Sequence, residues 1–134
     1  MNIKFTNTDA WILMGFPIND EGVSLSELIG RCDAINHAIP TKGEIEIALT
    51  KGVQSDIVVQ DGNRFKLSNE FVPLYEEVYK SKGGLFAFEN LHKKLKKLII
   101  NQSNDLRISL SDKEFKLACE EYTEQWTKLL KNKK

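Results

Sequence analysis

Two helix-capping boxes that stand close together constrain the fold of this chain more than any other feature of its sequence. In a capping box, a Ser or Thr side chain and a Glu three residues later each bind a free backbone N–H group at the start of a helix. The chain contains one box at Ser24 and Glu27 and another at Thr41 and Glu44. Pro40 lies directly before the second box and disfavours a helical conformation in the residue that precedes it. The sequence therefore predicts two short helices joined by a tight turn.

Both predicted helices have one apolar face. Apolar residues recur at helical spacing between positions 25 and 35, and Ile45, Ala48 and Leu49 face inward from the second helix. Asn36 and His37 are poor helix formers, and asparagine tolerates the left-handed conformation that ends many helices. Gly52 stands where a C-terminal glycine is expected, which places the second helix over Thr41–Lys51.

A β-hairpin is predicted directly after these helices. Asp61-Gly62 separates the β-prone run 57–59 from Arg64–Leu67, and Asp-Gly between such runs is a strong hairpin signal. Residues 64–67 alternate strictly between charged and apolar side chains. Phe65 and Leu67 are therefore expected to point into the core, and Arg64 and Lys66 toward water.

Further helices are expected on both sides of this stretch. A helix through residues 9–14, capped by Asn7 or Thr8, has almost no polar face, so it must be buried on more than one side. Three helices follow the hairpin: the first over 71–79, with Pro73 in its first turn, the second over 85–100, and the last from a capping box at Ser111 and Glu114.

The segments between these helices carry their own signals. Gly83-Gly84 marks a break that divides the chain into a first domain, 1–82, and a C-terminal helical extension, 83–134. The extension is expected either to dimerise or to pack on the first helix. Leu106, Ile108 and Leu110 alternate with polar residues, so a small strand is possible there.

The charge of the chain is unevenly distributed. Lys plus Arg and Asp plus Glu each number 19, but residues 1–75 hold six basic and ten acidic residues, a net charge of −4, which leaves +4 in the remainder. Affinity for DNA depends on neutralisation of phosphates by Lys and Arg. The acidic first part is therefore evidence against simple DNA binding.

The remaining composition favours a cytoplasmic, non-enzymatic protein. No signal peptide and no uncharged stretch of membrane-spanning length is visible, so no membrane partner is expected. Cys32 and Cys119 fall on apolar helical faces, which is typical of reduced, buried thiols. One Cys and one His, Cys32 and His37, do not make a zinc site, and no catalytic or nucleotide-binding motif occurs. Neither a metal nor a cofactor is expected, and an enzyme with an unrecognised site is the third hypothesis.

The order of helices and hairpin between Ser24 and Leu67 resembles the winged helix-turn-helix superfamily of bacterial regulators. More narrowly, residues 33–41, DAINHAIPT, look like a motif of small, mostly uncharacterised bacterial proteins of that build. The resemblance covers about half the chain, up to roughly Tyr79. It implies a mainly α fold with a small β-hairpin, in which a winged helix-turn-helix is followed by C-terminal helices. The helix from Thr41 to Lys51 would be the recognition helix, and the hairpin around Gly62 the wing.

The resemblance also implies candidate contacts with double-stranded DNA. They lie on the outward side of the recognition helix and on the wing: Lys42, Gly43, Glu46, Ile47, Thr50, Lys51, Arg64 and Lys66. An outward Ile47 suits a thymine methyl or a protein partner equally well. Arg64 could enter a minor groove or be an ordinary solvated strand residue. Lys93, Lys96 and Lys97 could bind phosphate or form a solvated helix face.

Two principal functions follow from these observations. The first is a DNA-binding transcriptional regulator that forms a homodimer through its C-terminal helices. The alternative is a winged-helix protein-interaction adaptor that does not bind DNA. Aromatic residues on the last helix, among them Phe115, Tyr122 and Trp126, exceed what a small winged helix needs and favour a homodimer.

Overall fold

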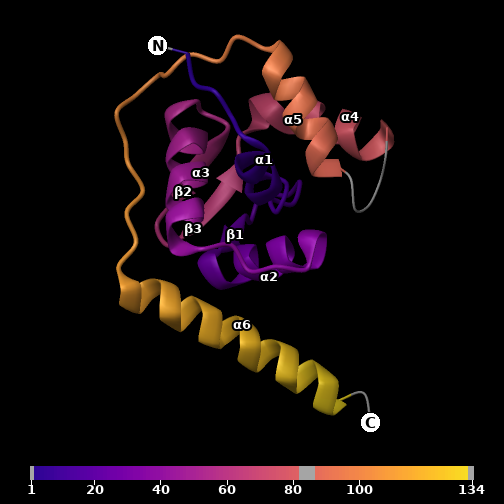
Figure 1. The fold of residues 1–134 in the computed structure, drawn as a ribbon, viewed down its shortest axis with the longest axis vertical. Helices are drawn as coiled ribbons and strands as arrows, with labels where there is room; N and C mark the ends of the chain where they lie inside the picture. Colours follow the sequence, from indigo (N-terminus) through magenta and orange to yellow (C-terminus); the bar gives the residue numbers. More distant parts are fainter. Residues whose placement is uncertain (1, 82–86, 133–134) are drawn as a thin grey trace.

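The computed structural model describes residues 2–81 and 87–132, which form a mainly helical fold with one small antiparallel sheet (Figure 1). The helical content and the hairpin confirm the coarse fold class predicted from the sequence. The elements in chain order are α1 (Asn7–Leu13), β1 (Val23–Ser24), α2 (Leu25–Asn36), α3 (Lys42–Gln54), β2 (Val58–Asp61), β3 (Arg64–Leu67), the 3-10 helix η1 (Asn69–Phe71), α4 (Val72–Ser81), α5 (Ala87–Lys97) and α6 (Asp112–Asn132).

Helices α2 and α3 begin where the capping boxes predict. The Ser24 hydroxyl accepts a hydrogen bond from the Glu27 N–H at 3.3 Å, and the Thr41 hydroxyl accepts one from the Glu44 N–H at 3.1 Å. Helix α2 ends at Asn36, in the stretch before Pro40 where the sequence predicts its end, but the left-handed residue is His37, with φ 54°, and not Asn36.

The predicted end of α3 at Gly52 is wrong, since the helix continues to Gln54. The left-handed residue beyond it is Asp56, with φ 62°. Gly52 serves packing instead: a Cβ atom at this position would lie 2.7 Å from Cγ2 of Val58 on β2. The glycine lets the strand approach the helix closely, which is a different use of the residue from a helix terminator.

The hairpin is confirmed, and a third strand joins it. The sheet has the order β1-β3-β2, with Val23 opposite Phe65 and Val58 opposite Leu67. Asp61 pairs with Arg64, so the two turn residues are Gly62, at φ 61°, and Asn63. Phe65 and Leu67 are buried as predicted, whereas the two-residue strand β1 is too short to show a period in the sequence.

Helix α1 lies at the centre of the fold, in contact with α2, α3 and α5 (Figure 1). Its all-round apolar character is explained by these three neighbours. The predicted caps are wrong: Thr6 caps the helix, and the Asp9 carboxylate closes the box by accepting from the Thr6 N–H at 2.9 Å. The buried Trp11 indole donates to the Cys32 carbonyl at 2.8 Å, which ties α1 to α2.

The C-terminal part crosses the body of the protein. After α5, the chain passes the N-terminal segment, where the Ile100 carbonyl accepts from the Ile3 N–H at 2.8 Å. Residues 102–111 then run extended along the side of α3, and α6 packs on α2 (Figure 1). Residues 106–110 form no β-ladder, in contrast to the suggested strand. Gly83-Gly84 lies outside the described residues. Within 2–81 and 87–132, no helix combines the length and the apolar composition needed to cross a bilayer.

Candidate interaction site on helix α3

One row of polar side chains runs the length of α3. We call it the polar stripe; its members occur every fourth residue and therefore lie on one line of the helix: Lys42, Glu46, Thr50 and Gln54. The extended residues 102–111, here called the strap, lie against this stripe. The site is thus made by two segments that are far apart in the sequence.

The polar stripe binds the backbone of alternate strap residues. The Lys42 ammonium donates to the Leu110 carbonyl at 3.2 Å, and the Glu46 carboxylate accepts from the Leu110 N–H at 2.8 Å. The Thr50 hydroxyl accepts from the Ile108 N–H at 3.0 Å and donates to the Ile108 carbonyl at 3.3 Å. Gln54 donates to the Leu106 carbonyl at 2.9 Å. Helix side chains therefore take the place that a neighbouring strand would occupy in a sheet.

The two ends of the strap are held in different ways: one by hydrogen bonds to the C-terminal end of α3, the other by an ion pair. Ser103 donates its N–H to the Gln54 carbonyl at 2.8 Å, and the Asn104 side chain donates to the Val53 carbonyl at 3.1 Å. These bonds satisfy carbonyls at the C-terminal end of α3 that lack intrahelical partners. At the other end, Lys42 pairs with Asp112 at 3.1 Å, and this hydrogen bond raises the pKa of Lys42 above its usual value.

Two apolar side chains anchor the strap. Ile108 and Leu110 are 9% and 8% exposed, whereas Leu106, Arg107 and Ser109 are exposed. Full burial of one such aliphatic side chain contributes about 1.5–3 kcal/mol. The alternation that suggested a strand therefore holds for Ile108 and Leu110 but not for Leu106, and it serves docking on a helix instead of pairing in a sheet.

Most of the predicted DNA contacts are engaged within the chain. Lys42, Glu46 and Thr50 bind the strap. Lys51 forms an ion pair with Asp9 at 2.6 Å, and the Asp9 side chain is only 3% exposed. Gly43 and Ile47 are exposed, Ile47 by 55%, and Lys66 is half-buried. The structure thus brings three of the predicted α3 residues together against the strap, and it leaves Gly43 and Ile47 open.

Arg64 on β3 joins the hairpin to the start of α2. Its guanidinium donates to Glu27 and to the Glu21 and Gly22 carbonyls, each at 3.0 Å. Burial opposes ionisation of Glu27, but hydrogen bonds from Ser24 and Arg64 outweigh it and lower the pKa of that carboxyl. Arg64, for which the sequence left open a minor-groove contact or an ordinary solvated position, therefore fixes the sheet against α2.

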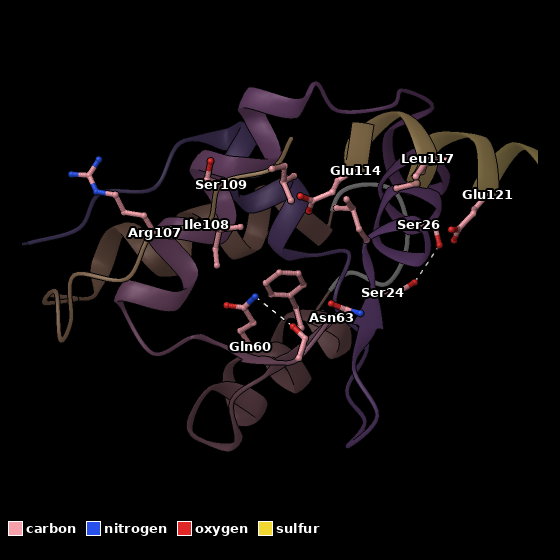
Figure 2. A pocket seen from close by; sticks show the side chains of 15 residues that line it. Ser24, Ser26, Gln60, Asn63, Arg107, Ile108, Ser109, Glu114, Leu117 and Glu121 are labelled. Atoms are coloured by element: carbon pink, nitrogen blue, oxygen red, sulfur yellow. Dashed lines mark hydrogen bonds between the residues drawn. The ribbon is translucent and has the colours of Figure 1, made fainter. Parts of the chain in front are cut away.

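A pocket of about 620 Å³ opens beside the strap. Figure 2 shows Gln60 and Asn63 from the hairpin, Ile108 from the strap and Glu114 from α6 arranged around it. The anchor side chains Ile108 and Leu110 form part of its wall, so the strap is not enclosed on this side. The sequence signals that could have located this site are the alternation in 106–110 and the four-residue repeat of the polar stripe.

Helix α6 continues from the strap and packs on α2. Its inner residues are Phe115, Ala118, Cys119 and Tyr122, and the Tyr122 hydroxyl donates to the Asp33 carboxylate at 2.5 Å. This hydrogen bond, with burial, raises the pKa of Tyr122 to about 12. Trp126 and Leu129, farther along α6, are more than half exposed. The apolar row on α6 therefore extends beyond its intramolecular contact.

The two cysteines are free thiols on different helices; Cys32 is buried as expected from the sequence, whereas Cys119 is only half-buried. Burial raises the pKa of Cys32 to about 12 and shifts that of Cys119 in the same direction. Neither is therefore activated as a nucleophile at neutral pH. In the described part of the chain, no three His, Cys, Asp or Glu side chains gather closely enough to hold a metal ion.

Comparison of the chain with protein-family models, with curated proteins and with solved structures found no match.

Proposed function

We propose that this chain is a protein-interaction module built on a winged helix-turn-helix, and that α3 does not read duplex DNA while the strap is seated. The winged-helix assignment is supported by the element order α1–β1–α2–α3–β2–β3 and the sheet order β1-β3-β2. The interaction role is supported by one observation above all: the polar stripe of α3 is bonded to the backbone of the strap.

The seated strap occupies polar side chains of α3 that DNA recognition would use. A recognition helix places free polar side chains against base edges, and free Lys and Arg residues against phosphates. In this chain the stripe is occupied, Lys51 is paired with Asp9, and Arg64 is bonded to Glu27. Each hydrogen bond of the strap contributes about 0.5–1.5 kcal/mol, so exposing the stripe carries a substantial free-energy cost.

A DNA-binding regulator is the second candidate, with the strap as its internal inhibitor. Thr50 and Gln54 are residue types that bind base edges, and release of the strap would expose both. This hypothesis differs from the first only in what α3 binds after the strap leaves.

The oligomeric state is part of the proposal. Trp126 and Leu129 continue the apolar row of α6, line a pocket beside Gly30 and Ala34 of α2, and are 54% and 55% exposed. We propose that this end of α6 forms a homodimer contact, because it lies on the same face as the residues that already pack on α2.

The deciding experiment is a low-salt titration of labelled duplex DNA with the full chain, followed by fluorescence anisotropy. Wild type is expected to show no saturable binding. A strap variant, Ile108→Asp with Leu110→Asp, is compared with a control of equal added charge at exposed strap positions, Leu106→Asp with Ser109→Asp. Absence of saturable binding in all three proteins supports the interaction module.

Two outcomes would overturn the proposed function. Saturable, salt-dependent binding by wild type would establish DNA binding with the strap seated. Saturable binding by the anchor variant alone would establish the inhibited regulator, because only that variant frees the polar stripe.

A further inference from the structure

We propose that the polar stripe of α3 and the adjoining surface that receives Ile108 and Leu110 bind an extended peptide with the pattern apolar–any–apolar–any–acidic. The strap occupies this site as an internal mimic of the peptide. This inference rests on the proposed function and deepens it, since it names the site and the chemical class of the partner. It is supported by the contacts through which the strap already occupies this site.

Recognition of the strap depends mainly on its backbone. Both backbone groups of Ile108 and both of Leu110 are bonded to side chains of the polar stripe. These bonds require an extended chain but no particular side chain, as in peptide recognition by strand addition. Any segment that extends in the same register could make them.

Selectivity comes from two buried apolar side chains of the strap and from the Asp112 carboxylate at the start of α6, whose side chain is 96% exposed. Ile108 and Leu110 are buried, while Ser109 between them is exposed. Asp112 follows Leu110 by two residues and pairs with Lys42 at 3.1 Å. The strap therefore defines a motif of two apolar residues at alternate positions and a carboxylate two residues later.

The strap is placed so that a second segment can exchange with it. The pocket beside it is lined in part by Ile108 and Leu110, so both anchors border a hollow as well as the core of the protein (Figure 2). Tethering gives the strap an effective concentration of about millimolar, so a free peptide competes poorly until the anchors are weakened. A partner peptide must therefore bind tightly enough to displace the tethered strap.

The test uses a fluorescent synthetic peptide that copies residues 103–112, SNDLRISLSD, added to the full chain. The anchor variant, Ile108→Asp with Leu110→Asp, is expected to bind it saturably and at least about tenfold more tightly than wild type. The matched control, Leu106→Asp with Ser109→Asp, is expected to behave as wild type. A peptide in which the two anchor residues are replaced by Asp is expected not to bind.

Two further variants make the test independent of the charges introduced. Ile108→Ala with Leu110→Ala weakens the anchors without adding charge, and it is expected to bind the peptide between wild type and the Asp variant. Thr50→Val in the anchor variant removes the hydroxyl that bonds Ile108, and affinity is expected to fall about two- to tenfold. Circular dichroism of each protein verifies that the helices remain folded.

The inference is overturned if the folded anchor variants, both Asp and Ala, show no saturable binding of the peptide. It is also overturned if the peptide with Asp at both anchor positions binds as tightly as the unchanged peptide. Its failure is distinguishable from failure of the proposed function. Saturable DNA binding by wild type contradicts the proposed function, whereas loss of peptide binding without DNA binding contradicts this inference alone.

Discussion

The ion pair between Lys51 on α3 and Asp9 on α1 gives the sharpest test of the structure. Its Nζ–Oδ2 distance is 2.6 Å, and the two side chains are 26% and 3% exposed. Lys51→Met keeps the length of the side chain but leaves the buried carboxylate without its cation. Removing one partner of a buried ion pair costs about 3–5 kcal/mol. The Thr6 N–H still donates to the carboxylate at 2.9 Å, so the loss is expected near the lower end, about 3 kcal/mol.

Urea unfolding, followed by circular dichroism, measures this loss as a change in the free energy of unfolding. Lys94→Met is the matched control, because Lys94 pairs with Glu77 at 3.4 Å and the Glu77 side chain is 66% exposed. Its expected loss is under about 1 kcal/mol. Adding Asp9→Asn to Lys51→Met should recover part of the stability, because the buried charge is then gone. Equal losses of unfolding free energy in the two Lys→Met variants would show that Lys51 is not held in a buried ion pair.

Three further predictions follow from particular contacts. Gly52→Ala is expected to lower the free energy of unfolding by about 1–3 kcal/mol, because its Cβ atom would meet β2. Gly43→Ala is the control: its Cβ atom meets no described atom within 4 Å, so it should raise the free energy of unfolding by about 0.5–1 kcal/mol. Equal effects of the two substitutions in urea unfolding would contradict the packing of Gly52 against β2. The pKa of Tyr122 is about 12 in the folded chain, so between pH 10 and about 12 the folded chain keeps a proton that the unfolded chain loses. The free energy of unfolding should therefore fall as pH rises through that window, and less steeply in Tyr122→Phe. Identical pH profiles for the two proteins would argue against the bond between Tyr122 and Asp33. Sedimentation should show a dimer for wild type and a monomer for Trp126→Glu with Leu129→Glu; a monomeric wild type would rule out the α6 contact.

The sequence by itself determined the local features of this protein. The boxes at Ser24 and Thr41 start α2 and α3, and the alternation over 64–67 sets the two faces of β3. These signals are readable because a helix cap or a strand face depends on residues only a few positions apart. The same locality left the helix ends uncertain: His37 and Asp56, not Asn36 and Gly52, take the left-handed conformation.

Only the tertiary structure decided what each exposed-looking polar residue binds. Periodicity placed Gly43, Ile47 and Thr50 on the outward face of α3, flanked by Glu46 and Lys51. Gly43 and Ile47 are exposed, whereas Glu46 and Thr50 bind the strap, which comes from residues 102–111. The partners of Lys51 and Arg64 are likewise remote in sequence. Spacing along a helix determines which side chains share a face. What lies opposite that face depends on the path of the whole chain, because long-range contacts form only where packing of the core brings distant segments together.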